Sequence, residues 1–155
     1  MTKHKIEKTV GSFAAALGRG IIAGIAGTAA ITISQMIEMK ITGRKPSTAP
    51  ADAASKVLHI KPATEQDKQQ FSQQVHWTYG TSWGVARALI AETGLEGIPA
   101  SLLHFVAIWG TAMIIEPKLG VAPPVTEWEP KSIAIDALHH AVYAAVAGLV
   151  YDAID

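Results

Sequence analysis

The sequence predicts an all-α fold: an integral membrane four-helix bundle with up-and-down connections and a long, partly helical loop between the first and second spans. Only 17% of the 155 residues are charged, whereas soluble domains average about 25%. The charged residues are clustered, which leaves apolar stretches close to the ~20 residues that cross a bilayer as a helix. The chain is too short for two domains, so we treat residues 1–155 as one membrane domain.

The first span is predicted over residues 12–38. Residues 20–37 carry no charge and would form about 27 Å of helix, against about 30 Å of hydrocarbon. A basic segment precedes this stretch, as in a signal peptide. The apolar stretch is too long for a signal peptide and lacks a clear cleavage site, so we expect an uncleaved span.

The second span is predicted over residues 75–92, although one arginine lies well inside it. An even number of spans allows the helices to pack as two hairpins, which favours including it. The loop before it, residues 40–74, is polar and is predicted to contain a short amphipathic helix over residues 51–59. Thr64 followed by Asp67 is typical of a helix start, so the second helix is expected to begin outside the membrane.

The third span is predicted over residues 98–116 and is expected to end before Pro117. The residue before a proline disfavours helical geometry, so we expect the backbone of Glu116 to be non-helical. The fourth span is predicted over residues 132–151, with Asp136 as its only charge before the end.

Small and polar residues recur at helical spacing in every span, while the other faces are apolar. This is the reverse of a soluble amphipathic helix, and it predicts polar stripes that face one another inside a bundle surrounded by lipid. The stripes are Gly20, Gly24, Gly27, Ile31, Gln35 and Glu38; His76, Gly80, Gly84 and Arg87; Ser101, His104, Ile108 and Thr111; and Asp136, His140, Tyr143 and Ala147, with His139 adjacent.

Up-and-down connections would bring carboxylates and imidazoles from all four helices to the end of the bundle that carries the long loops. Such ligands from facing helices form metal sites in bundles, and histidine also changes charge near neutral pH. One interpretation is a divalent metal or proton site formed by Glu38, His76 and His140, completed by Glu116 or Asp136. The other is that these residues are simply hydrated at the lipid–water boundary. A non-covalent haem between two of the histidines, for example His76 and His140, is a weaker alternative.

At the opposite end, Arg19 and Arg87 are expected at similar depth, with His104 among the buried polar residues. A membrane-embedded arginine needs a partner or a wet cavity. Either the arginines extend to the headgroups or pair with Glu92 or Asp152, or they line a pocket for an anion or lipid headgroup.

Several functional classes lose support. The formal net charge is zero and no basic run occurs, which argues against nucleic-acid binding. The absence of cysteine excludes disulfides and thiolate chemistry. No G-x-S-x-G motif supports a hydrolase. We therefore assign no catalytic residue, favour a protein that is not an enzyme, and expect no cofactor beyond the divalent metal considered above.

Basic residues predict the orientation. Eight lie in the two long loops and beside them, and three lie near the N-terminus. By the positive-inside rule, the long loops are cytoplasmic and the protein is a multi-pass protein of the cell inner (plasma) membrane.

Several short motifs resemble small bacterial inner-membrane proteins of unknown function, broadly of the YagU-like type. They are Gly43-Arg44-Lys45-Pro46-Ser47, the stretch from His76 to Gly84, Gly120-Val121-Ala122-Pro123-Pro124, and His139-His140. The resemblance implies a multi-span membrane protein with a role in acid tolerance and makes His76, His139 and His140 candidate proton-responsive groups.

The expected role is envelope homeostasis, proton or small-ion handling, or partnership with another membrane protein or a second copy of the chain. The alternative is a membrane-embedded metal- or haem-binding protein with redox or hydrolytic activity.

Overall fold

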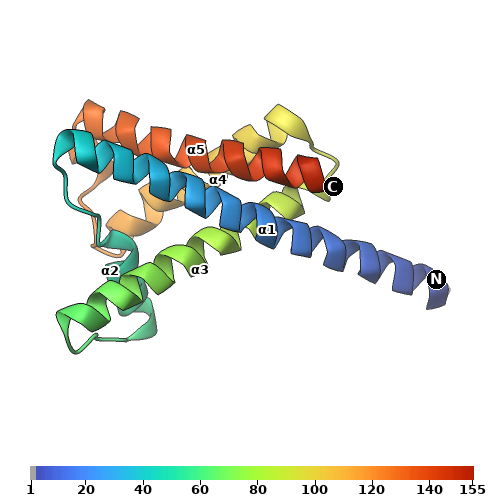
Figure 1. The fold of residues 1–155 in the computed structure, drawn as a ribbon, viewed down its shortest axis with the longest axis horizontal. Coiled ribbons are helices and arrows are strands. Elements are labelled where there is room, and N and C mark those ends of the chain that lie inside the picture. The colour runs from blue at the N-terminus through green and yellow to red at the C-terminus, as the bar shows by residue number, and fades with distance from the viewer. Residues whose placement is uncertain (1–2) are drawn as a thin grey trace.

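The computed structural model describes the chain from Lys3 to Asp155, with side chains from Glu7 onward. Within this part of the chain every regular element is helical, which confirms the all-α prediction (Figure 1). The elements are α1 (Lys3–Thr42), α2 (Ala49–Leu58), α3 (Glu65–Ala91), α4 (Gly97–Lys118), the 3₁₀ turn η1 (Val125–Glu127) and α5 (Pro130–Ile154).

Each of the four long helices contacts the next one along the chain, and α5 also contacts α1. α1 packs along α3 and along α5, while α4 contacts both α3 and α5. Successive long helices run in opposite directions, so both long connections lie at one end and the C-terminus lies at the other (Figure 1). The short helix α2 rests against α3 and α4 at the loop end.

Three helices in the described part of the chain are long and apolar enough to cross a membrane: Glu7–Thr42 of α1, and the whole of α4 and α5. α3 is 27 residues long but is not among them. Its N-terminal residues 65–74 are almost entirely polar, which lowers the hydropathy of the helix. The composition therefore supports three of the four predicted spans.

The predicted small-residue face of α1 forms the contact with α3. A Cβ added at Gly20 would lie 2.5 Å from the carbonyl oxygen of Gly84, and one added at Gly84 would lie 2.6 Å from the Cα of Gly24. Such contacts are too short for any side chain, so glycine permits the close backbone approach. On the outer face of α1, Ile22 and Ile33 are 55% and 58% exposed. The predicted apolar exterior and small-residue interior of this helix are confirmed.

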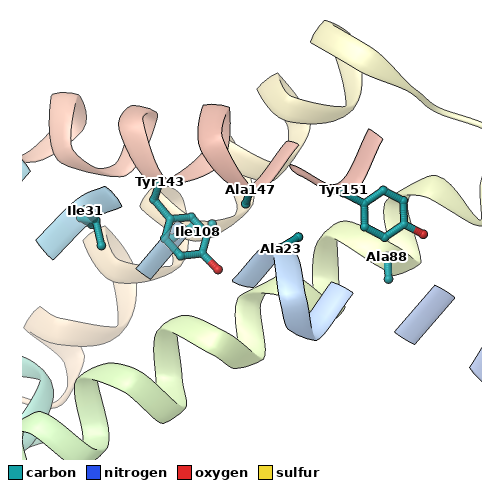
Figure 2. Packing of buried hydrophobic residues seen from close by; sticks show 7 residues of the cluster. All are labelled: Ala23, Ile31, Ala88, Ile108, Tyr143, Ala147 and Tyr151. Carbon is teal, nitrogen blue, oxygen red and sulfur yellow. The ribbon is translucent and has the colours of Figure 1, made fainter. Parts of the chain in front are cut away.

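The core is small and lies where α1, α3 and α5 meet, with one contribution from α4 (Figure 2). Its buried members are Ala23, Ile31, Ala88, Ile108, Tyr143, Ala147 and Tyr151. The ring of Tyr143 occupies the space that a side chain at Gly27 would fill. Alanine and glycine therefore set the helix spacing, and two tyrosines fill the wider gaps.

Two local predictions about helix ends have opposite outcomes. Thr64 and Asp67 form a reciprocal capping box at the start of α3, as predicted. The expectation that Glu116 would be non-helical is wrong, because α4 continues through Pro117 to Lys118. Proline lacks an amide hydrogen and removes one helical hydrogen bond. Pro117 lies in the last turn, and the amides of Leu119 and Gly120 still bond to the carbonyls of Ile115 and Pro117.

Candidate functional site

A cavity of about 580 Å³ opens at the loop end of the molecule. It lies among the C-terminal parts of α1 and α4, the middle of α3 and the N-terminal half of α5, and the start of α2 and the loop around η1 also line it. Its walls include every residue of the predicted metal or proton site together with His139: Glu38, His76, Glu116, Asp136, His139 and His140. The sequence-based grouping of these residues from four helices is therefore found in one cavity.

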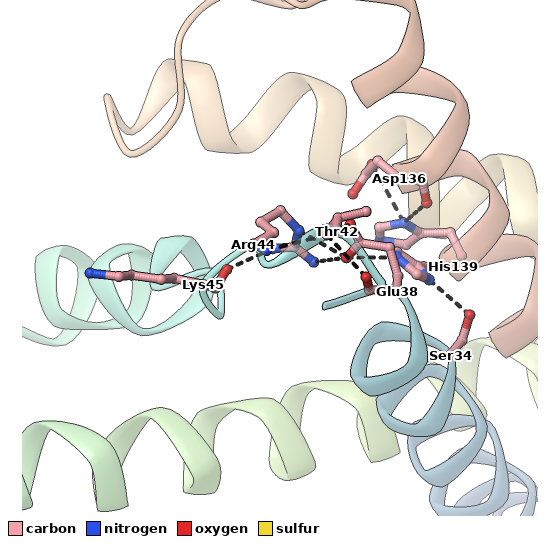
Figure 3. Close-up of polar contacts among 8 residues, drawn as sticks. Ser34, Glu38, Thr42, Arg44, Lys45, Asp136 and His139 are labelled. Carbon is pink, nitrogen blue, oxygen red and sulfur yellow. Dashed lines mark hydrogen bonds and ion pairs between the residues drawn. The ribbon is translucent and has the colours of Figure 1, made fainter. Parts of the chain in front are cut away.

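The carboxylate of Glu38 is held by a loop arginine (Figure 3). Nε of Arg44 donates a hydrogen bond to Oε2 of Glu38 at 2.9 Å, and Nη2 forms an ion pair with the same oxygen at 2.8 Å. The hydroxyl of Thr42 donates to Oε1 at 2.8 Å. Because α1 ends at Thr42 and the chain turns back at Gly43 with a φ of 73°, Arg44 reaches the last turn of its own helix.

His139 lies beside this pair and is only 3% exposed. Its Nδ1 lies 2.8 Å from the hydroxyl of Ser34, and its Nε2 lies 3.9 Å from Oε2 of Glu38. Within the described residues Nε2 has no hydrogen-bond partner. Nε2 of His139 is thus a buried ring nitrogen without a partner beside the carboxylate of Glu38 (Figure 3).

Asp136 forms the other side of the cavity. The indole Nε1 of Trp109 donates to Oδ2 at 2.9 Å. Nδ1 of His140 lies 2.9 Å from the main-chain oxygen of Asp136 and 3.5 Å from its Oδ2. Since a carbonyl oxygen only accepts, Nδ1 of His140 carries the proton. Glu116 lines the same cavity from α4.

His76 contributes a third imidazole from α3. Its Nε2 lies 2.8 Å from the hydroxyl of Thr32. That hydroxyl already donates its hydrogen to the carbonyl of Thr28 at 2.7 Å. Nε2 of His76 is therefore the donor, and its Nδ1 carries the free lone pair.

The arrangement does not by itself form a metal centre. In the described part of the chain, no three His, Asp or Glu side chains are close enough together to hold one ion. Glu38 is paired with Arg44, and Asp136 is bonded to Trp109. The residues share a cavity but have separate neighbours, and metal binding stays a prediction.

At the opposite end of the helices, the predicted buried arginines are paired. Arg87 is fully buried and forms an ion pair with Asp152, one of its two expected partners. Arg19 pairs with Asp155 at 2.6 Å rather than with Glu92 or Asp152. Both guanidinium groups also lie over the ring of Tyr151, at 5.7 Å for Arg19 and 4.6 Å for Arg87.

Sequence reasoning did not single out Arg44 or Trp109. Arg44 follows the last turn of α1. It reaches the carboxylate of Glu38 because the helix ends at Thr42, and the sequence does not fix that end residue. Trp109 lies on the apolar third span, and no spacing within α4 relates it to Asp136 on α5.

Comparison with protein-family models, curated proteins and solved structures finds no match to this chain.

Proposed function

We propose that this chain is a four-span protein of the inner membrane whose loop-end cavity takes up and releases protons or binds a small cation. The observation that carries the proposal is the gathering of imidazoles and carboxylates from all four long helices in one cavity. These groups lie on four helices, three of which expose large apolar side chains on their outer faces. In such a setting each charge has a large effect on its neighbours.

Membrane insertion is supported by the surface of the molecule. Large apolar side chains are exposed on all three apolar helices, including Ile22 on α1, Leu102 on α4 and Leu149 on α5 at 55%, 60% and 71%. Water would make this surface unfavourable, and lipid would not. We include the C-terminal half of α3 as the fourth span, because its polar residue Arg87 is fully buried against α5 and does not face lipid.

Proton exchange is supported by the pairing within the cavity. Glu116 and Asp136 are two carboxylates that line the same cavity, and a proton or small cation bound there would reduce the repulsion between like charges. Nε2 of His139 has no hydrogen-bond partner among the described residues and lies near Glu38, so a proton bound there would be stabilised by that carboxylate. The cavity thus offers adjacent places where a proton can bind.

The test is to follow the histidines of the full chain in lipid nanodiscs by NMR, using labelled imidazole rings. We expect His139 to bind a proton as the pH is lowered. We also expect Glu38→Gln to alter the titration curve of His139. His59 is exposed in the loop after α2 and serves as the internal control, since its curve should not change.

A His139 that binds no proton as the pH is lowered would refute the proposal, and so would a His139 curve that is identical in the variant. Extraction of the protein from membranes by alkaline carbonate without detergent would refute the membrane assignment. If the resemblance to YagU-like proteins extends to acid tolerance, cells that depend on this chain should survive acid less well when they carry His76→Ala or His140→Ala.

A divalent metal bound by the same residues is the competing proposal, and the donor types in the cavity favour it. Metal analysis of the protein purified in detergent, with an optical spectrum for haem, distinguishes the two. Stoichiometric metal, or a visible absorption band, would replace the proton site by a metal or haem centre.

A further inference from the structure

The loop-end cavity is larger than a proton or a bare metal ion requires. Its volume of about 580 Å³ falls within the range of roughly 300–1,000 Å³ that is typical of sites for small organic molecules. In the described part of the chain, no three His, Asp or Glu side chains gather closely enough to hold one metal ion. The acidic side chains are instead spread around the walls, an arrangement that suits a larger ligand.

The charge of the walls is mostly negative. Five carboxylates and one guanidinium line the cavity: Glu38, Glu116, Glu127, Glu129 and Asp136, with Arg44. Arg44 is already paired with Glu38. Among the described residues, none of the other four carboxylates forms an ion pair with a lysine or arginine. A cavity lined by one sign of charge concentrates ligands of the opposite sign, so this one favours a cation.

The inner part of the cavity is apolar. On α1, α4 and α5, an apolar or aromatic lining residue lies two helical turns deeper than a lining carboxylate. The pairs are Glu38 with Ile31, Glu116 with Ile108, and Asp136 with Tyr143. The three deep residues are buried and belong to the core cluster (Figure 2). At 1.5 Å per residue, about 10–12 Å of helix separates the acidic level from this apolar floor.

Aromatic rings and one unpartnered polar group complete the walls. Tyr79 and Trp83 line the cavity from α3, with their ring centroids 6.1 Å apart in an edge-to-face arrangement. Trp128 lines it directly after η1, where its Nε1 donates to the carbonyl of Pro123 at 2.9 Å. Aromatic faces attract cations and also offer apolar surface. His139 is buried with Nε2 unpartnered among the described residues, and a ligand with a polar head would give this nitrogen a partner.

We propose that the loop-end cavity binds an organic cation, an ammonium group joined to an apolar or aromatic body. The ammonium group lies among the carboxylates, and the body extends inward to Ile31, Ile108 and Tyr143. The inference rests on the proposed cation uptake in this cavity and deepens it by naming the class of cation.

Ammonium groups also occur in the headgroups of phospholipids. In a phospholipid the ammonium group is joined to a phosphate, which the unpaired carboxylates of the walls would repel. The only guanidinium that lines the cavity within the described residues is already bound to Glu38. The ligand is therefore a free organic cation and not a lipid headgroup.

The experiment is equilibrium dialysis of radiolabelled benzyltrimethylammonium against the full chain in the non-ionic detergent dodecyl maltoside. We expect saturable binding of one cation per chain. Unlabelled tetramethylammonium keeps the charge but lacks the apolar body, so it should compete about tenfold more weakly or worse. Benzenesulfonate keeps the ring but is an anion, and it should not compete.

Glu116→Gln combined with Asp136→Asn removes two negative charges with little change in shape. This double variant should bind benzyltrimethylammonium about tenfold more weakly or worse, with a thermal unfolding temperature close to that of the wild type. Glu116→Gln alone leaves the bond between Asp136 and Trp109 in place. It should weaken binding in the same direction, and it supplies the test if the double variant is unstable. Glu92→Gln, outside the cavity, is the matched control and should bind like the wild type.

Absence of saturable binding would overturn the inference, and so would wild-type affinity in folded Glu116→Gln and in the double variant. Phosphocholine that competes as well as choline would indicate a lipid headgroup and overturn the free cation. If cation binding fails while the His139 titration still responds to Glu38→Gln, the proposed proton exchange stands and only this inference falls. If both fail, the proposed function falls as well.

Discussion

The contact between α1 and α3 allows a sharp prediction about glycine. Gly84 lies against Gly20 and Gly24, and a Cβ added to it would be 2.6 Å from both the Cα and the amide nitrogen of Gly24. Ordinary van der Waals contact begins at 3.4 Å. Both groups belong to backbone and cannot rotate away, and the carbonyl oxygen of Gly20 would lie closer still. Gly84→Ala must therefore push the two helices apart by at least about 0.8 Å, the difference between these distances.

The size of the effect follows from two opposing terms. Alanine favours a helix over glycine by about 0.5–1 kcal/mol. Overpacking of a rigid contact costs about 1–3 kcal/mol, and the separation would also weaken the adjoining contact of Gly80 with Thr28. We therefore expect a net loss of about 1–2 kcal/mol in the free energy of unfolding.

The assay is unfolding in mixed micelles of detergent and sodium dodecyl sulfate, followed by circular dichroism. Gly110→Ala is the matched control, because Gly110 is also inside a helix and no atom lies within 4 Å of its added Cβ. It should be neutral or slightly stabilising. If Gly84→Ala were as stable as Gly110→Ala, the close approach of α1 and α3 would be refuted.

Three further predictions concern other contacts. Asp152→Asn leaves the buried charge of Arg87 without its counter-ion and should destabilise the protein by about 2 kcal/mol in the same assay, a value reduced because Asp152 is partly exposed. Glu92→Gln is the control and should have little effect. Equal stability of the two variants would argue against the buried ion pair. Thr64→Ala removes the cap of α3 and should cost about 1 kcal/mol, with faster hydrogen exchange in the first turn of that helix, whereas Thr78→Ala on its exposed face should not. Lys56 donates to the carbonyls of Leu119 at 2.6 Å and Gly120 at 3.1 Å, so Lys56→Ala should speed amide hydrogen exchange in α2. Lys61→Ala is the control. Exchange in Lys56→Ala as slow as in Lys61→Ala would show that this contact does not hold α2 in place.

The sequence was most informative where one helix determines its own pattern. The spacing of Gly20, Gly24 and Gly27 was sufficient to predict the inner face of α1, because a helix of fixed period presents these residues together. The capping residues of α3 are equally local. Glu116 was mispredicted since the disfavoured geometry before a proline is a tendency, and the last turn of α4 overrides it.

The candidate site was predicted only as a set of residues. Up-and-down connections were sufficient to bring Glu38, His76 and His140 to one end, and the cavity contains all three. Their individual partners depend on how neighbouring helices rotate against each other, which no single helix pattern specifies. The pairing of Arg19 with Asp155 depends in the same way on where α5 ends beside α1.

Two ion pairs of α1 are separated by a fixed distance along the helix axis. Arg19 pairs with Asp155 near the middle of α1, and Glu38 pairs with Arg44 near the C-terminal end of the helix. At 1.5 Å per residue these anchor points are about 28 Å apart, close to the ~30 Å of a typical hydrocarbon layer. If α1 spans a bilayer as we propose, a thinner bilayer would require the helix to tilt, or the lipid to stretch locally to meet the two charged pairs.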